Sequence, residues 1–149
     1  MANSIQQAKI AATPSEKVKT NELAGRVRVA FAEYEANAEQ STIHMFSLPN
    51  GARILGGRLA HDALGSSTTL SVGNNAYIYS SGSTVALDVD EFKAAASSAS
   101  ASSVAVAQTI ALGENSVVNA DKDGLPVTVT IAGADGTNTI QLQMTYVVD

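Results

Sequence analysis

The sequence predicts an all-β protein, built as a single antiparallel β-sandwich of the jelly-roll type with an extended N-terminal arm. Roughly eight short β-patterned runs, separated by Gly, Asn and Pro turns, recur between residues 25 and 149. Hydrophobic residues make up 45% of the chain but aromatic residues only 5%, so Val, Ile, Leu and Ala must form the core. A chain of 149 residues is long enough for one such core. We therefore expect an arm over residues 1–24 and a sandwich body over residues 25–149.

The first strands are predicted from their side-chain period and their turns. Val27, Val29 and Phe31 alternate with smaller or charged residues, the period of a half-buried strand. Residues 42–48 form a second run, which ends at the turn signal Pro49-Asn50-Gly51. A third run covers residues 52–64 and contains Gly56-Gly57. Paired glycines inside a strand indicate a bulge or a close approach of another backbone.

The middle of the chain is less regular. Two further runs cover residues 68–72 and 76–79, with a turn at residues 73–75 between them. Acidic residues suit a helix N-terminus, so Asp90 and Glu91 predict a short helix that continues to Ala96. The Ala/Ser tract over residues 97–103 is of low complexity, and it fits either an exposed loop or a flat strand.

The C-terminal part predicts a β-hairpin. Apolar and Thr or Gln residues alternate over residues 127–131 and again over residues 139–148. Residues 133–136, Gly-Ala-Asp-Gly, supply the turn between the two runs. The polar face of this hairpin carries Thr and Gln without charge, so it can remain solvated or pack against a second protein surface.

Charge is distributed unevenly along the chain. Residues 1–28 carry five basic and two acidic groups, a net +3, whereas the remainder carries four basic and twelve acidic groups, a net −8. A basic arm is attracted to an acidic neighbour, including another copy of the same chain. The alternative is a solvated tail. The candidate contacts with a partner are the basic residues of this region: Lys9, Lys17, Lys19, Arg26 and Arg28.

Composition argues against several classes of function. The chain has no Cys, which excludes disulfides, thiolate metal sites and a Cys nucleophile. The acidic body has no basic patch with interleaved aromatic residues, so nucleic-acid binding is not expected. No run approaches the length of a membrane span and no signal-peptide pattern is present, so we expect synthesis in the cytoplasm and no membrane partner.

No motif predicts catalysis, a cofactor or a metal, and the chain is expected not to be an enzyme. His44 and His61 with Asp62 could begin a metal site, but further His or Cys ligands are missing and structural roles are favoured. Residues 121–124, Asp-Lys-Asp-Gly, lack the later ligands of a calcium loop and predict a plain turn. Residues 88–91 form an acidic cluster, either a solvated loop or a place for a cation between subunits. Residues 80–83 predict another turn.

A resemblance to known proteins is carried by the order and spacing of several segments. These are residues 25–34 (GRVRVAFAEY), 45–57 (MFSLPNGARILGG), 64–73 (LGSSTTLSVG), 92–101 (FKAAASSASA) and the closing 146–148 (YVV). In these segments the chain resembles small β-rich virion structural proteins of tailed bacteriophages. The arm lies outside the resemblance, and residues 76–89 depart from the pattern as an insertion would.

The resemblance implies a structural component of the phage head. Such proteins include decoration or cement proteins, which sit on the outer capsid surface and lock capsomers together. We accordingly expect a virion protein that binds the major capsid protein through its arm and forms a homotrimer, since many weak copies around a symmetry axis gain avidity. The alternative is a head fibre, knob or tail component that contacts the host surface, with Tyr77, Tyr79 and the Ser-rich loops as its contact candidates.

Overall fold

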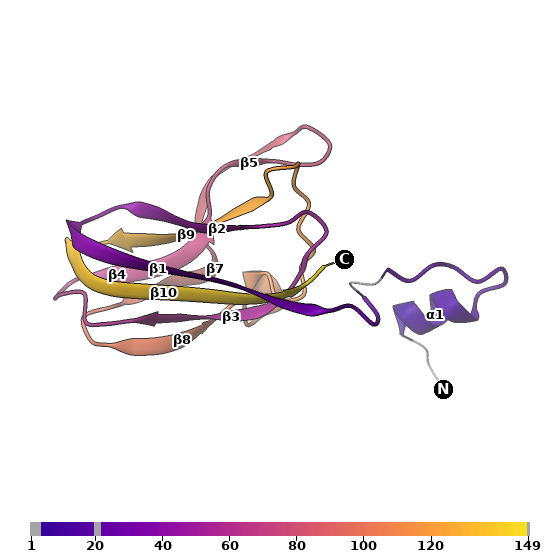
Figure 1. The fold of residues 1–149 in the computed structure, drawn as a ribbon, viewed down its shortest axis with the longest axis horizontal. Helices are drawn as coiled ribbons and strands as arrows, with labels where there is room; N and C mark the ends of the chain where they lie inside the picture. The colour runs from indigo at the N-terminus through magenta and orange to yellow at the C-terminus, as the bar shows by residue number, and fades with distance from the viewer. Residues whose placement is uncertain (1–3, 20–21, 149) are drawn as a thin grey trace.

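Two four-stranded antiparallel sheets pack face to face in the computed structural model, which describes residues 4–19 and 22–148 (Figure 1). Sheet A has the order β1 (Val27–Glu39), β10 (Gly136–Val147), β3 (Arg53–His61) and β8 (Ser102–Val106). Sheet B has the order β2 (Thr42–Leu48), β9 (Leu125–Ala132), β4 (Thr69–Asn74) and β7 (Asp88–Ser97). Successive strands of the sandwich alternate between the sheets, except that β4 and β7 pair within sheet B. This strand order is that of a jelly roll and confirms the predicted fold class.

The core lies between the sheets and is aliphatic, as the composition predicted. Leu59, Ile140, Leu142 and Met144 point inward from sheet A and are fully buried. The inward face of sheet B supplies a matching set: Leu70, Val72, Val127, Val129 and Ile131. Fully burying one such side chain stabilises the fold by about 1.5–3 kcal/mol, so these two facing rows hold the sheets together.

Strand β1 forms where its alternation predicts, but the face that points outward carries the large apolar residues Val27, Val29 and Phe31. Val27, Val29 and Phe31 are 62%, 60% and 58% exposed. The opposite face packs on the core through Ala30, Tyr34 and the buried Ala36. Both faces of this strand contain apolar residues, so the period fixes the strand without fixing which face is buried.

The paired glycines serve both purposes that the sequence suggested. The register between β3 and β10 shifts by one residue beside Gly56, whose φ is +134°, so the strand bulges there. At Gly57 an added Cβ would lie 2.6 Å from the carbonyl oxygen of Gln143 on β10. Any side chain at this position would therefore push the two strands apart.

The predicted C-terminal hairpin is wrong in its pairing, although both strands and the turn are present. β9 belongs to sheet B and β10 to sheet A, so the chain crosses the sandwich between them. Gly133 adopts φ +84° at this crossing and approaches the carbonyl oxygen of Ser67 closely. The turn residues specify that the chain reverses direction, but they do not specify whether the two strands belong to the same sheet. Here the apolar faces of the two strands meet across the core instead of lying side by side in one sheet.

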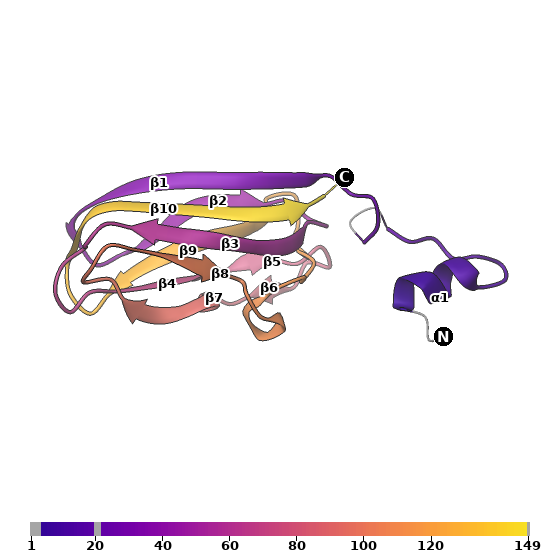
Figure 2. The same cartoon turned by 90° about the horizontal axis from the view of Figure 1, so that it is seen from below.

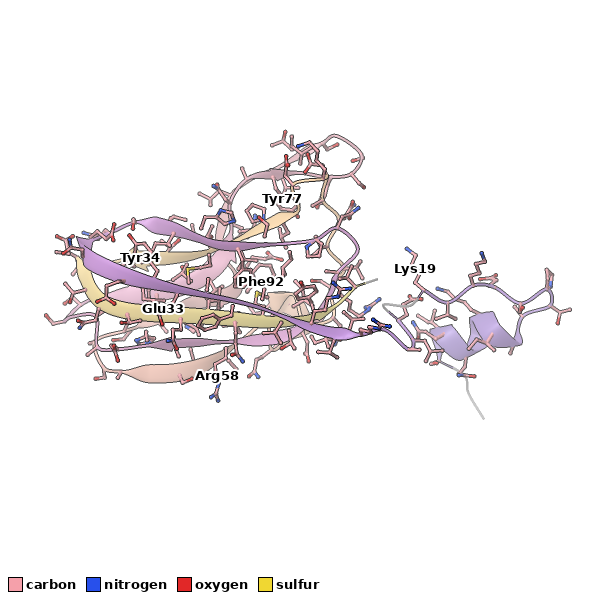
Figure 3. All side chains as sticks on the ribbon, viewed as in Figure 1. Lys19, Glu33, Tyr34, Arg58, Tyr77 and Phe92 are labelled. Atoms are coloured by element: carbon pink, nitrogen blue, oxygen red, sulfur yellow. The ribbon has the colours of Figure 1, made fainter. Side chains whose placement is uncertain are left out.

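The predicted helix from Asp90 to Ala96 is also wrong, because these residues belong to strand β7. Phe92 is buried between the sheets (Figure 3), and the backbone of β7 pairs with β4 at Val72–Lys93 and Leu70–Ala96. Tertiary pairing thus overrides a weak helical preference. The Ala/Ser tract is a turn followed by the start of β8. Its Ser98 is buried and donates a 2.9 Å hydrogen bond to Thr68 Oγ1.

The arm was predicted to be extended, but its described part contains helix α1 (Ile5–Ala11). This helix lies beyond the end of the sandwich in both views (Figures 1 and 2), and it has no buried residue. The remaining elements are a small hairpin, β5 (Tyr77–Ile78) with β6 (Thr84–Val85), and the 3-10 turn η1 (Ile110–Leu112). Among the described residues, no helix is long and apolar enough to cross a membrane.

Candidate docking surface

Helix α1 begins at a side-chain cap and is tied to the body by one carboxylate. Ser4 Oγ accepts a 3.3 Å hydrogen bond from the backbone N–H of Gln7. Glu22 lies between the arm and the body, with its carboxylate 3.6 Å from Lys9 Nζ and 3.9 Å from Arg53 Nη2. The Lys19 backbone N–H, together with Lys9 and Arg53, lowers the pKa of Glu22. This clasp of Lys9, Glu22 and Arg53 orients the first part of the arm relative to sheet A.

The five basic residues predicted as partner contacts are spread along the arm and the start of β1. Lys9 is engaged by Glu22, whereas Lys17 and Lys19 are exposed in the segment that follows α1. Figure 3 shows Lys19 in this segment. Arg26 and Arg28 are exposed where the chain enters sheet A. These cations therefore follow the chain from the arm to the start of β1.

An exposed apolar strip begins at the start of β1 in sheet A. Val29 and Phe31 stand opposite Thr145 and Gln143 of β10, on the face that points away from the core, whereas Val147, opposite Val27, is buried. We call Val27, Val29, Phe31, Thr145 and Gln143 the β1–β10 strip. Three large apolar side chains in a row, each more than half exposed, form a surface that favours contact with another protein. Single exposed hydrophobic residues are ordinary, but this row is continuous with the arm.

Further along β1 the same face becomes acidic. Gln141 Nε2 donates a 2.6 Å hydrogen bond to Glu33 Oε2, and Thr139 Oγ1 donates a 2.7 Å bond to Glu35 Oε2. These two bonds hold the carboxylates on the sheet surface, and Arg58 of β3 extends from the same sheet (Figure 3). The outer face of sheet A thus runs from apolar to acidic along β1, while Arg28 alternates with Val27 and Val29 and lies on the other face of the strand.

Sequence reasoning predicted the basic residues but missed the strip. The available signal was the presence of apolar residues on both faces of β1, together with the uncharged Thr and Gln face of β10. The uncharged Thr and Gln face of β10 is compatible with packing against another protein surface. The partner strand β1 could not be assigned from the sequence, because β10 was expected to pair with β9.

The two histidines and the turn at residues 121–124 lie on different elements of the fold. His44 lies on β2 and its Nε2 is 3.2 Å from Ser47 Oγ, whereas His61 lies on β3 with Nδ1 2.8 Å from the Asp62 carbonyl oxygen. Residues 121–124 form the predicted turn, since the Gly124 N–H donates to the Asp121 carbonyl oxygen at 3.2 Å. Within residues 4–19 and 22–148, no three His, Cys, Asp or Glu side chains come together as metal ligands.

The fold places the chain among jelly-roll proteins, and comparison with solved structures finds this fold in phage capsids. A chain from the capsid asymmetric unit of cyanophage Pam1 is similar with a TM-score of 0.59 and 19% identity over 84% of this chain and 86% of that one. A chain from the capsid of Ralstonia phage GP4 gives a TM-score of 0.61 and 20% identity, with the same coverage. A chain from the acid-stable capsid of Helicobacter pylori bacteriophage KHP30 gives a TM-score of 0.56 and 16% identity, over 82% of this chain and 87% of that one.

These similarities show a shared fold at low sequence identity. No protein-family model and no curated protein sequence matches the chain.

Proposed function

We propose that the protein is a bacteriophage capsid decoration, or cement, protein that binds the outer surface of the major capsid protein and stabilises the head. The arm and the β1–β10 strip together form the contact. One observation carries this proposal: a row of apolar side chains, each about 60% exposed, begins where a basic arm enters the sheet. The three similar chains come from phage capsid structures, which supports a structural role in the virion.

The arm and the β1–β10 strip contribute differently to binding, because one is basic and the other is apolar. The apolar strip supplies contact area, because burial of apolar surface is the main favourable term in association. Lys17, Lys19 and the arginines at the start of β1 attract an acidic partner and orient the approach. The jelly roll itself contributes a rigid platform, so few residues need ordering when it binds.

Several copies around a local three-fold axis would strengthen the attachment. Each contact can be weak, because a homotrimer that binds at several points gains avidity without any new contact. The acidic face around Glu33 and Glu35 offers a place for the basic arm of a neighbouring copy. The proposal therefore includes a homotrimer on the capsid surface.

A second candidate function is a head fibre, knob or tail component that contacts the host surface. The observation that favours it is the β5–β6 hairpin, which projects from the sandwich (Figure 1) and carries the exposed Ile78. Copy number separates the two functions, because a decoration protein covers the shell and a fibre or tail component occupies a few positions. A third possibility, hydrolysis of host polysaccharide, would contradict both if the purified protein performed it.

The experiment that tests the proposal compares full-length protein with a variant lacking residues 1–24. Both are mixed with capsids that lack the protein and then sedimented. We expect the truncated chain to fold, as judged by circular dichroism and thermal unfolding, and to lose capsid binding. Saturation of capsids by the truncated protein with unchanged affinity would contradict the role of the arm.

A charge variant provides a finer test. Replacing Lys17 and Lys19 by Gln should weaken capsid binding and make it less sensitive to salt. The matched control is Lys122→Gln, because Lys122 is an exposed lysine on the turn after η1, paired with Asp123 at 2.7 Å. The control should bind capsids as the unaltered protein does.

A further inference from the structure

The β5–β6 hairpin is held against the body at two points, and a cleft lies beneath it. The Asp121 backbone N–H donates a 2.8 Å hydrogen bond to the Ile78 carbonyl oxygen, and Ser80 Oγ donates a 2.6 Å bond to Asn119 Oδ1. At the other side, Asn74 is buried and its Nδ2 donates to the carbonyl oxygens of Asn75 and Ala86. These bonds fix both ends of the hairpin, so the cleft is preformed.

The walls of the cleft are aromatic and aliphatic. The cleft has a volume of about 470 Å³, within the range of small-ligand sites. Tyr77 and Tyr79 stand with their ring centroids 5.7 Å apart and their planes at 90°, so two walls of the cleft meet at a right angle. Tyr77 lies at the base of the hairpin (Figure 3), and Leu87 and Val117 add exposed apolar surface.

The charge of the lining is entirely negative. Asp88 and Glu91 line the cleft, and no basic side chain is among the described residues that line it. Partial burial and the negative charges of Asp88 and Asp90 raise the pKa of Glu91. Burial, Tyr79 and Glu91 also raise the pKa of Tyr77. Each of these groups is thus held in a site where added positive charge is favourable.

We propose that this cleft binds a primary or quaternary ammonium group carried on an aliphatic stem, such as a lysine side chain. The ammonium lies between the Tyr rings and the carboxylates of Asp88 and Glu91, and the stem packs on Leu87 and Val117. Aromatic faces attract cations, and ammonium ligands are bound in proteins by such aromatic walls. Anionic ligands would be repelled by the two carboxylates. A neutral ligand would leave the mutual repulsion of the acidic side chains unrelieved.

This site is separate from the docking surface, and its test requires no capsid. The ammonium could come from a lysine of another copy's arm, such as Lys17 or Lys19, or from a free amine. Both sources share the chemistry that the cleft recognises. The two can be distinguished by comparing a peptide of residues 5–19 with small ammonium compounds.

The experiment is a titration of the full-length protein, isotopically labelled and followed by two-dimensional NMR. The probes are Nα-acetyl-lysine methylamide, choline and Nα-acetyl-norleucine methylamide, which has a similar aliphatic stem without the ammonium. We expect saturable shifts at Tyr77, Tyr79 and Glu91 with at least one ammonium probe, and binding about tenfold weaker for the norleucine compound.

Variants then test the residues. Glu91→Gln and Tyr79→Leu should each weaken ammonium binding about tenfold. The control Asp135→Asn, an exposed carboxylate in the turn between β9 and β10, should bind as the unaltered protein does. A spectrum that otherwise matches the unaltered protein shows that each variant is folded.

The arm peptide identifies the source. The arm of a neighbouring copy is the ligand if two results are obtained together. The arm peptide binds more tightly than Nα-acetyl-lysine methylamide, and the same peptide with all three lysines changed to Gln does not bind more tightly than that compound. If choline binds more tightly than the arm peptide, the ligand is a free amine, and the proposal still holds. Equal binding of the norleucine compound, shifts that lie away from the cleft, or unchanged binding by Glu91→Gln would overturn it.

Discussion

Phe31 on β1 lies directly opposite Gln143 on β10, and both side chains are exposed on the face that points away from the core. An aromatic side chain that is 58% exposed, beside an uncharged amide, contributes little to folding. It is available for contact with another protein, because neither residue carries a charge that would need desolvation. This pair marks the end of the β1–β10 strip that lies next to Glu33.

Substitution of the strip should separate binding from stability. We expect Val29→Thr combined with Phe31→Thr to change the free energy of unfolding by no more than about 0.5 kcal/mol, since both sites are exposed and Thr suits a strand. Capsid binding, measured by cosedimentation, should fall at least tenfold. Leu142→Ala on the buried face of β10 is the contrasting variant and should cost about 2–5 kcal/mol of stability. Full capsid binding by the double Thr variant would remove the strip from the contact.

Two glycines should respond differently to the same added methyl group. Gly57→Ala places a Cβ 2.6 Å from the Gln143 carbonyl oxygen, so we expect a loss near the upper end of the ~1–3 kcal/mol typical of overpacking. Gly82 in the β5–β6 turn has φ +91° and open space around it, so Gly82→Ala should cost only about 1 kcal/mol of backbone strain. Denaturant unfolding of both variants measures the difference. Equal losses would show that β3 and β10 can move apart without penalty.

The hydrogen bond between Tyr34 and Glu39 should give a defined pH dependence. Tyr34 Oη donates to Glu39 Oε1 at 2.6 Å, which lowers the pKa of Glu39 below 4.5 and raises that of Tyr34 above 10.0. A lowered carboxyl pKa stabilises the fold above the unfolded value, and that stabilisation is lost as pH falls through the folded pKa. A raised Tyr pKa stabilises the fold below its unfolded value, and that stabilisation is lost as pH rises through the folded pKa.

The unaltered protein should therefore be more stable than Tyr34→Phe by a constant amount at neutral pH. The difference should shrink below about pH 4 and above about pH 10. Unfolding midpoints in denaturant across this range provide the measurement. A difference that does not vary at either extreme would mean that the bond contributes nothing through these two groups.

The clasp at Glu22 makes a further prediction about the arm. Glu22→Gln removes the charge that both Lys9 and Arg53 approach, so α1 should lose its orientation relative to sheet A. Amide hydrogen exchange in residues 5–11 should become faster, while exchange in the core strands stays unchanged. The effect should also diminish in high salt, because exposed ion pairs are screened. Exchange in α1 that matches the unaltered protein would contradict a role for the clasp.

Local pattern predicted most strands and the fold class, because alternation and turn residues are local properties. The bulge at Gly56 and the close approach at Gly57 were both expected from the glycine pair alone. The order of the strands within the sheets does not follow from local pattern. The turn at residues 133–136 fits either a hairpin within one sheet or a crossing between the two sheets. Strand β7 was missed because the burial of Phe92 and pairing with β4 are decided by distant residues.

Only the basic part of the proposed docking surface could be nominated from the sequence, for the same reason. Charge counting identified the basic residues of the arm and of the start of β1. The exposure of Val27, Val29 and Phe31 depends on which face of β1 meets the core, and the period of a strand with apolar residues on both faces does not decide that. The cleft under the β5–β6 hairpin joins Tyr77 and Tyr79 to the loop at Asn119, a contact between segments far apart in sequence.

The most direct test of the proposed function is a cryo-electron microscopy reconstruction of the virion that contains this protein. We predict density for the jelly roll on the outer surface of the shell, repeated at equivalent positions around its local three-fold axes. The arm and the β1–β10 strip should face the major capsid protein. Density confined to the tail or to a single vertex, or a strip that faces solvent in the assembled particle, would contradict the account.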